Sequence, residues 1–130
     1  GLSLGILCLL LAFFVLAYSK EKVHRIWALF NIVVALWGLG TCFSGMATTS
    51  ESAISRWKLT YLPCTFIAIV FYHLICSFCN LKRNKIFRFA YIQGFIFLPF
   101  IILSDFFVNS TIYVFNSIHY HKATLLFTIY

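Results

Sequence analysis

Two groups of residues have types and spacings that could bind a metal ion or exchange electrons. The first is Cys76 and Cys79, which stand two residues apart, with His73 one helical turn before them. A structural zinc site takes four ligands, and no second pair accompanies this one. Free cysteine is commonly a small buried apolar side chain, and both cysteines end a long apolar run. Packing between helices therefore explains this pair better than redox or metal chemistry.

His119 and His121 form the second group. Side chains two residues apart lie on the same side of a strand, and such pairs bind zinc or copper when further ligands join them. The sequence shows no third and fourth ligand beside them, so a polar loop near lipid headgroups is the simpler interpretation. His73 lies within an apolar run, where we expect a structural hydrogen bond. We therefore expect no metal ion and no cofactor.

The chain has few carboxylate side chains that could take part in catalysis. The 130 residues include three acidic ones, Glu21, Glu51 and Asp105. The sequence contains no glycine-rich phosphate loop, no pair of catalytic carboxylates and no Ser/His/Asp set of the kind that active sites use. We expect this chain to have no enzymatic activity of its own.

The composition is that of a membrane protein. Hydrophobic residues make up 62% of the chain and charged residues 10%, whereas soluble domains carry roughly 25% charged residues. This balance excludes both a soluble globular enzyme and a disordered tail. The formal net charge is +7, but the basic residues are clustered between apolar runs. That placement favours contact with lipid headgroups over binding of nucleic acid.

Four apolar runs, at residues 2–18, 27–45, 59–79 and 86–104, are followed by the start of a fifth at 123–130. A segment that crosses lipid must pair its backbone groups internally, so these runs are predicted to be helices. We predict an all-α polytopic transmembrane bundle, a single integral-membrane domain over residues 1–130 that is truncated on its C-terminal side. Residues 111–115 and 118–121, separated by Asn116-Ser117, could form a small extracytoplasmic β-hairpin or a structureless loop.

The basic residues predict the orientation. Seven of the ten lie in segments 19–26 and 80–88: Lys20, Lys22, Arg25, Lys82, Arg83, Lys85 and Arg88. The other three are Arg56, Lys58 and Lys122. The positive-inside rule places the two richer segments in the cytoplasm. The N-terminus, residues 46–58 and residues 105–122 are then outside.

Stripes of mostly small residues predict which helix faces pack together, because small side chains let membrane helices approach closely. In the second run the stripe is Asn31, Ala35, Gly38, Cys42 and Gly45. In the third run it is Tyr61, Thr65, Ala68, Tyr72, Cys76 and Cys79. We expect both stripes inside the bundle. Asn31 and Gln93 could each make an interhelical hydrogen bond.

The second and third runs carry a family resemblance. "RIWALFNIVVALWGLG" and "SRWKLTYLPCTFIAIVFYHLICSF" resemble the N-terminal seven-transmembrane region of bacterial sensor histidine kinases, a region that also precedes some diguanylate cyclases. The matching positions are Phe30, Asn31, Trp37, Arg56, Trp57, Tyr61, Pro63 and His73. The resemblance supplies no ligand and no binding-site residue.

The resemblance implies a sensor or input domain in a bacterial inner membrane, which passes a signal to a cytoplasmic output module and forms a homodimer through the intact protein. Two alternatives stay open. A fragment of a transporter or permease would have broken spans with polar groups at mid-membrane, for which Gln93 and Pro99 are the hint. A small membrane redox protein would use the cysteine pair and the histidines.

Overall fold

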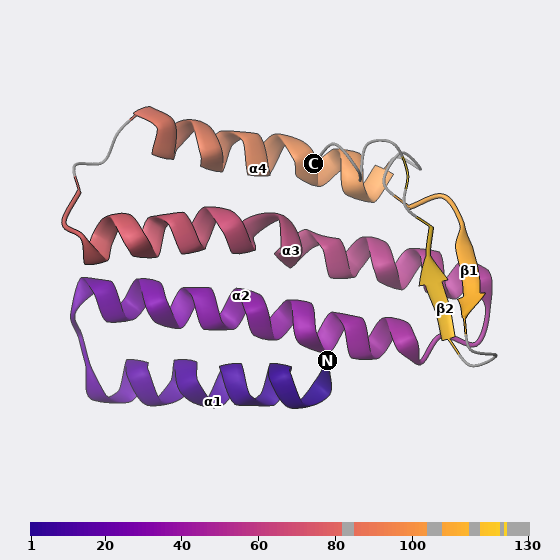
Figure 1. Ribbon diagram of the computed structural model, residues 1–130, viewed down its shortest axis with the longest axis horizontal. Helices are drawn as coiled ribbons and strands as arrows, with labels where there is room; N and C mark the ends of the chain where they lie inside the picture. Colours follow the sequence, from indigo (N-terminus) through magenta and orange to yellow (C-terminus); the bar gives the residue numbers. More distant parts are fainter. Residues whose placement is uncertain (82–84, 104–107, 115–117, 123, 125–130) are drawn as a thin grey trace.

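A computed structural model describes residues 1–81, 85–103, 108–114, 118–122 and 124, and over these residues the chain forms four helices and a two-stranded sheet (Figure 1). The elements are α1 (Leu2–Tyr18), α2 (Lys22–Gly45), α3 (Ser50–Phe78), α4 (Lys85–Leu103), β1 (Thr111–Val114) and β2 (Ile118–His121). The sequence predicted the helices correctly as elements. The hairpin, one of two possibilities left open, is present.

The four helices lie side by side in chain order, each antiparallel to the next (Figure 1). Residues 19–21 and 79–81 lie at one end of this layer, which we call the basic end. Residues 46–49 and the sheet lie at the other, which we call the hairpin end. The two segments predicted to share one side of the membrane therefore flank the same end of the bundle.

Two helices begin several residues before their apolar runs, α2 at Lys22 and α3 at Ser50. α3 begins at Ser50, well before the run that starts at residue 59, because Thr49 caps it: the Thr49 hydroxyl accepts a hydrogen bond from the Ser52 amide at 3.3 Å, and the Ser52 hydroxyl accepts one from the Thr49 amide at 3.4 Å. With 29 residues, α3 is about 43 Å long, which exceeds the roughly 30 Å of a hydrocarbon core.

Three of the described helices, α2, α3 and α4, are long and apolar enough to cross a membrane. α1 is also apolar but has 17 residues, just below that length. Large apolar side chains lie exposed along the helices, among them Phe13 at 69% and Phe89 at 67%. A continuous surface of this kind is typical of a lipid-facing protein. The chain is accordingly a membrane protein.

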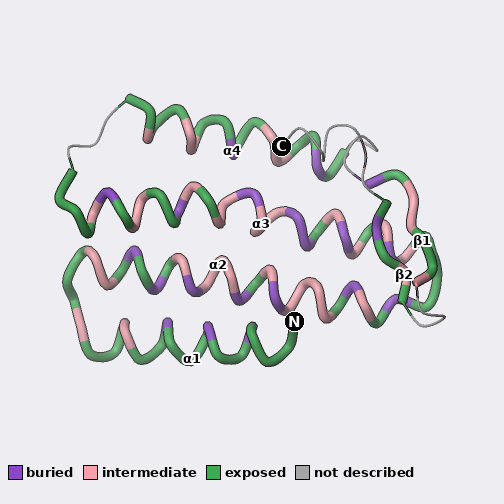
Figure 2. Tube along the Cα trace, in the orientation of Figure 1, coloured by how far each residue is buried: buried purple, intermediate pink, exposed green. Residues whose placement is uncertain are grey.

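The seam between α1 and α2 is built from small residues. α1 buries Gly5, Cys8 and Ala12, and a Cβ atom added to Gly38 would stand 3.0 Å from the carbonyl oxygen of Gly1 and 3.1 Å from the Gly5 nitrogen. The stripe predicted on α2 is confirmed in its first three members, which are buried (Figure 2). The prediction fails at the last residue of the stripe, because Gly45 faces open space.

The stripe predicted on α3 is wrong at three of its six positions. Tyr61, Thr65 and Cys76 are buried, but Ala68, Tyr72 and Cys79 are exposed. The physical reason is the position of α3 between α2 and α4, with the hairpin over its first turns. A helix with neighbours on both flanks buries two faces, so one straight stripe cannot describe its packing.

The seam between α2 and α3 is partly polar. The hydroxyl oxygens of Ser44 and Thr60 lie 2.9 Å apart and are buried. A Cβ atom added to Gly40 would stand 2.9 Å from the Thr60 hydroxyl. Glycine therefore lets the two helices approach closely here.

The sheet is antiparallel, with Thr111 opposite His121 and Val114 opposite Ile118. It packs against α3 and α2 at the hairpin end. The predicted turn at 116–117, the bases Lys82 and Arg83, and residues 123 and 125–130 of the predicted fifth run lie outside the described residues.

Candidate functional site

An aromatic cluster joins α3 to the last strand. Trp57 and Tyr61 stand one turn apart on α3. The indole Nε1 of Trp57 donates a hydrogen bond to the His119 carbonyl at 3.0 Å, and the Tyr61 hydroxyl lies 2.7 Å from Nε2 of His121. The ring of Trp57 also lies 4.9 Å from that of His121 and 5.1 Å from that of Tyr120. These contacts hold β2 against the first half of α3.

Three rings of the cluster are buried, and their polar atoms are paired. Trp57 is 6% exposed, Tyr61 8% and His121 7%. Burial lowers the pKa of His121, because removing an ionisable group from water disfavours its charged form. The imidazole is therefore neutral near pH 7. Tyrosine and tryptophan are well suited to this position, since their rings pack in the cluster while their polar tips bind the hairpin.

A cavity of about 960 Å³ opens beside the cluster, between the start of α1, the end of α2, the first half of α3, and β2. Its lining consists of Gly1, Leu2, Ser3, Trp37, Thr41, Cys42, Gly45, Trp57, Tyr61, Cys64, Ile118, Tyr120 and His121. Among the described residues of this lining there is no Asp, Glu, Lys or Arg side chain, and the histidine is neutral. An apolar, aromatic wall with a few hydroxyl, thiol and imidazole groups suits a neutral molecule that carries a ring and a hydrogen-bonding group.

Three residues that carry the family resemblance meet at this cavity: Trp37, Trp57 and Tyr61. Arg56 lies next to Trp57 on α3, but its side chain contacts the end of α2 and not the cavity. Its Nη1 donates to the Phe43 carbonyl at 3.0 Å, and its guanidinium lies 4.2 Å from the centre of the Phe43 ring. Arginine thus binds a carbonyl near the end of α2, where helical carbonyls lack partners.

The other four positions of the resemblance lie away from the cavity. Phe30 packs against Phe71, with ring centres 5.6 Å apart. Pro63 lies inside α3, beside an apolar groove of about 630 Å³ between α2, α3 and α4. Nδ1 of His73 lies 3.0 Å from the Tyr91 hydroxyl, which is the structural hydrogen bond that the sequence predicted.

The interhelical hydrogen bond considered possible for Asn31 is not the bond that the structure shows. Its amide nitrogen donates to the Trp27 carbonyl of its own helix at 2.9 Å. A carbonyl four residues earlier on the same helix can satisfy a short polar side chain, so no second helix is needed here. Gln93 is exposed on α4.

The possible metal-binding pairs do not come together with further ligands. Cys76 is buried and Cys79 is exposed, while His121 is engaged by Tyr61. In the part of the chain that the structure describes, no three His, Cys, Asp or Glu side chains gather closely enough to hold an ion. α3 and α4 continue through Pro63 and Pro99 as unbroken helices, unlike the interrupted spans that mark many transporter sites.

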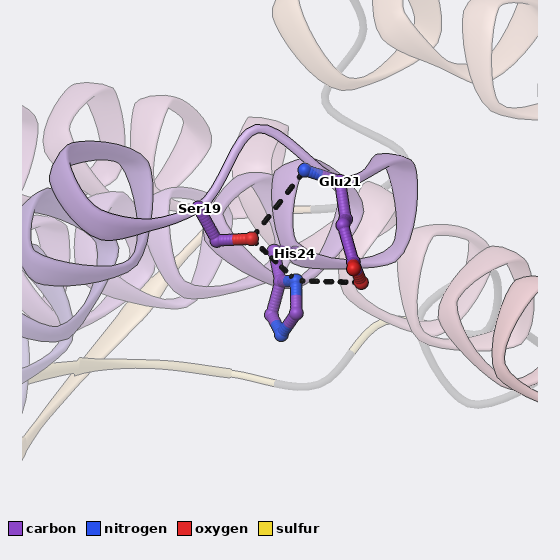
Figure 3. A network of polar contacts seen from close by, with 3 residues as sticks. All are labelled: Ser19, Glu21 and His24. Atoms are coloured by element: carbon purple, nitrogen blue, oxygen red, sulfur yellow. Dashed lines mark hydrogen bonds and ion pairs between the residues drawn. The ribbon is translucent and has the colours of Figure 1, made fainter.

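Sequence reasoning missed a polar network in the turn between α1 and α2 (Figure 3). Nδ1 of His24 lies 2.8 Å from the Ser19 hydroxyl and 3.4 Å from a carboxylate oxygen of Glu21, and the Glu21 amide donates to Ser19 at 3.4 Å. The cluster of Ser, Glu and His between two apolar runs was the available signal. Sequence reasoning also missed Tyr120 as part of the aromatic cluster.

Comparison of the chain with family models, with curated proteins and with solved structures gives no match.

Proposed function

We propose that this chain is the membrane-embedded input region of a bacterial signalling protein, which detects a small neutral molecule at the hairpin end and passes the signal to a cytoplasmic output module. The observation that carries the proposal is the aromatic cavity, whose wall is shared by β2 and α3. Support also comes from the resemblance to sensor kinase regions, since three of its positions line this cavity.

The geometry offers a way to transmit the signal. A ligand that entered the cavity would contact both the hairpin and the Trp57–Tyr61 face of α3. α3 runs without interruption from there to the basic end, so a tilt or shift of its first turns would reach the other side of the membrane. Such a shift requires a ligand that binds one position of α3 more tightly than the other.

The proposed topology is that of the bacterial inner membrane, with all four helices spanning it and the basic end in the cytoplasm. α1 would span with the help of its close packing on α2. The resemblance implies two further spans beyond the fifth run, a catalytic cytoplasmic region encoded in the same gene, and a homodimer of the intact protein.

The test uses the intact gene product reconstituted in lipid vesicles. Its autophosphorylation, or its cyclisation of GTP, should change when Trp57 is replaced by Ala, because the cavity wall is lost. Leu36→Ala should leave the output unchanged, since Leu36 is an exposed residue of α2 outside the cavity. A gene that encodes no catalytic region after this membrane region would overturn the proposal. A transporter or a small membrane protein would then become the better interpretation.

A further inference from the structure

A second cavity, of about 400 Å³, lies at the basic end, between the start of α2, the end of α3 and the start of α4. It is lined by Lys22, Val23, His73, Cys76, Ser77, Asn80, Leu81 and Phe87. It shares no residue with the aromatic cavity, which lies towards the other end of α3.

Three side chains around this cavity can donate hydrogen bonds. Among the described residues, Lys22, Ser77 and Asn80 make no side-chain hydrogen bond or ion pair. Lysine offers a positive charge with three donors, serine a hydroxyl and asparagine an amide group. Among the described lining residues there is no carboxylate. The nearest acidic residue in the sequence, Glu21, is bound to His24 in the neighbouring turn (Figure 3).

The walls of the cavity are fixed by their own contacts. The His73 ring lies 4.3 Å from the Phe87 ring in an edge-to-face arrangement, and its Nδ1 lies 3.0 Å from the Tyr91 hydroxyl. At the rim, Asn80 takes a left-handed backbone with φ of 51°, and the Leu81 amide donates to the Cys76 carbonyl at 2.9 Å. This arrangement is a regular helix C-terminus, and it holds Asn80 at the cavity edge.

We infer that this cavity binds a phosphate group, with Lys22 neutralising its charge and Ser77 and Asn80 donating hydrogen bonds to its oxygens. Phosphate oxygens are acceptors, which matches this set of donors. The charge of the neighbouring segments also favours an anion, because segments 19–26 and 80–88 contain seven of the ten basic residues and one of the three acidic ones. Val23, Leu81 and Phe87 would contact the apolar part of a lipid.

Two sources supply this chemistry: the phosphodiester of a membrane lipid and free inorganic phosphate. Basic pockets between membrane helices bind anionic lipid headgroups. The experiment titrates the purified protein, in a neutral maltoside detergent at low salt, with short-chain phosphatidylglycerol in one arm and with inorganic phosphate in the other. A short-chain diacylglycerol, which lacks phosphate, is the blank. The readout is the unfolding temperature, which rises when a ligand binds the folded state.

Binding should appear as a saturable rise in unfolding temperature with phosphatidylglycerol, with phosphate, or with both. A response to phosphatidylglycerol alone identifies a lipid site, and a response to phosphate alone identifies a soluble anion. Lys22→Gln should weaken the binding about fivefold, since one lysine near anionic lipid contributes about 1 kcal/mol. Asn80→Asp should abolish it by placing a negative charge at the rim. Lys20→Gln removes the same charge from an exposed turn residue that does not line the cavity, and should leave binding unchanged.

Two results would overturn the inference. One is no rise beyond the diacylglycerol blank in either arm. The other is an equal loss of affinity in Lys22→Gln and Lys20→Gln, because that outcome means diffuse attraction to a basic surface without a defined site.

Discussion

The hydroxyl of Tyr61 lies 2.7 Å from Nε2 of His121, although the two residues are 60 positions apart in the chain. This pair, with the Trp57 indole on the His119 carbonyl, ties β2 to the first half of α3. The aromatic cavity exists because the hairpin is held there. The stability of the hairpin end and the shape of the cavity should therefore change together.

Removal of the Tyr61 hydroxyl should loosen the hairpin. Tyr61→Phe leaves a buried imidazole nitrogen without this partner, so we expect the free energy of unfolding to fall by about 1–3 kcal/mol. Hydrogen exchange at the amides of residues 118–121 should become faster. Tyr18→Phe is the matched control, since Tyr18 is 86% exposed. Equal stability of the two variants would contradict the assigned role.

The stability of the hairpin end should depend on pH through His121. Burial lowers its folded-state pKa below the ordinary value of 6.5. The unfolded chain therefore binds more protons as the pH falls below about 6.5, and the free energy of unfolding decreases there. Above that pH the contribution of His121 to the free energy of unfolding is fully present. Thermal unfolding between pH 5 and 8 measures this dependence.

Two histidine variants test the assignment. His121→Gln should flatten the decrease below pH 6.5. His119→Gln should keep it, because the docking contact at that position is made by the backbone carbonyl. A decrease that survives in His121→Gln would mean that another group is responsible.

Because α1 and α2 approach closely at Gly38, we expect a larger side chain at this position to destabilise the protein. Gly38→Leu places a side chain against the backbone of Gly1 and Gly5, so stability in detergent should fall by on the order of 1–3 kcal/mol. Gly45→Leu, on the same helix, enters open space and should be mild. Leu36→Ala should also be mild, because Leu36 is 52% exposed. Similar losses at all three positions would refute the packing face.

Cysteine accessibility tests the proposed orientation. In a background without the native cysteines, Thr48→Cys should react with a membrane-impermeant maleimide in intact cells. Lys20→Cys should react only after permeabilisation. Both positions are exposed and lie at opposite ends of the bundle. The reverse pattern would place the basic end outside, against the positive-inside rule.

The sequence predicted the helices because long apolar runs leave the backbone no other structure in lipid. The helix boundaries were less predictable from hydropathy, because an apolar run marks only the part of a helix that suits lipid. α3 begins earlier than its apolar run, directly after the Thr49 cap. The face of α2 that contacts α1 followed from Gly38 and Ala35. The face of α3 did not, because its partners lie on two flanks and one stripe could not describe both.

The candidate site was predictable only in part. Trp57 and Tyr61 were singled out, and the two-residue spacing of His119 and His121 placed them on the same side of a strand, although a polar loop was the simpler interpretation; in the structure that side is the less exposed one. Their meeting across 60 positions depends on where the hairpin docks, which no local pattern encodes. Of the donors around the basic-end cavity, Ser77 and Asn80 lie three residues apart at the end of α3, while Lys22 comes from the start of α2, so only the packing of the helices brings Lys22 to them.

The arrangement of helices in chain order has a consequence for biosynthesis. α2 can pack on α1, and α3 on α2, as soon as each helix has been synthesised, because the preceding neighbour in the layer has already been made. The aromatic cluster has to wait until residue 121 has left the ribosome. During synthesis, Trp57 and Tyr61 therefore remain uncovered until the hairpin arrives, and its docking is a late step in the maturation of this region.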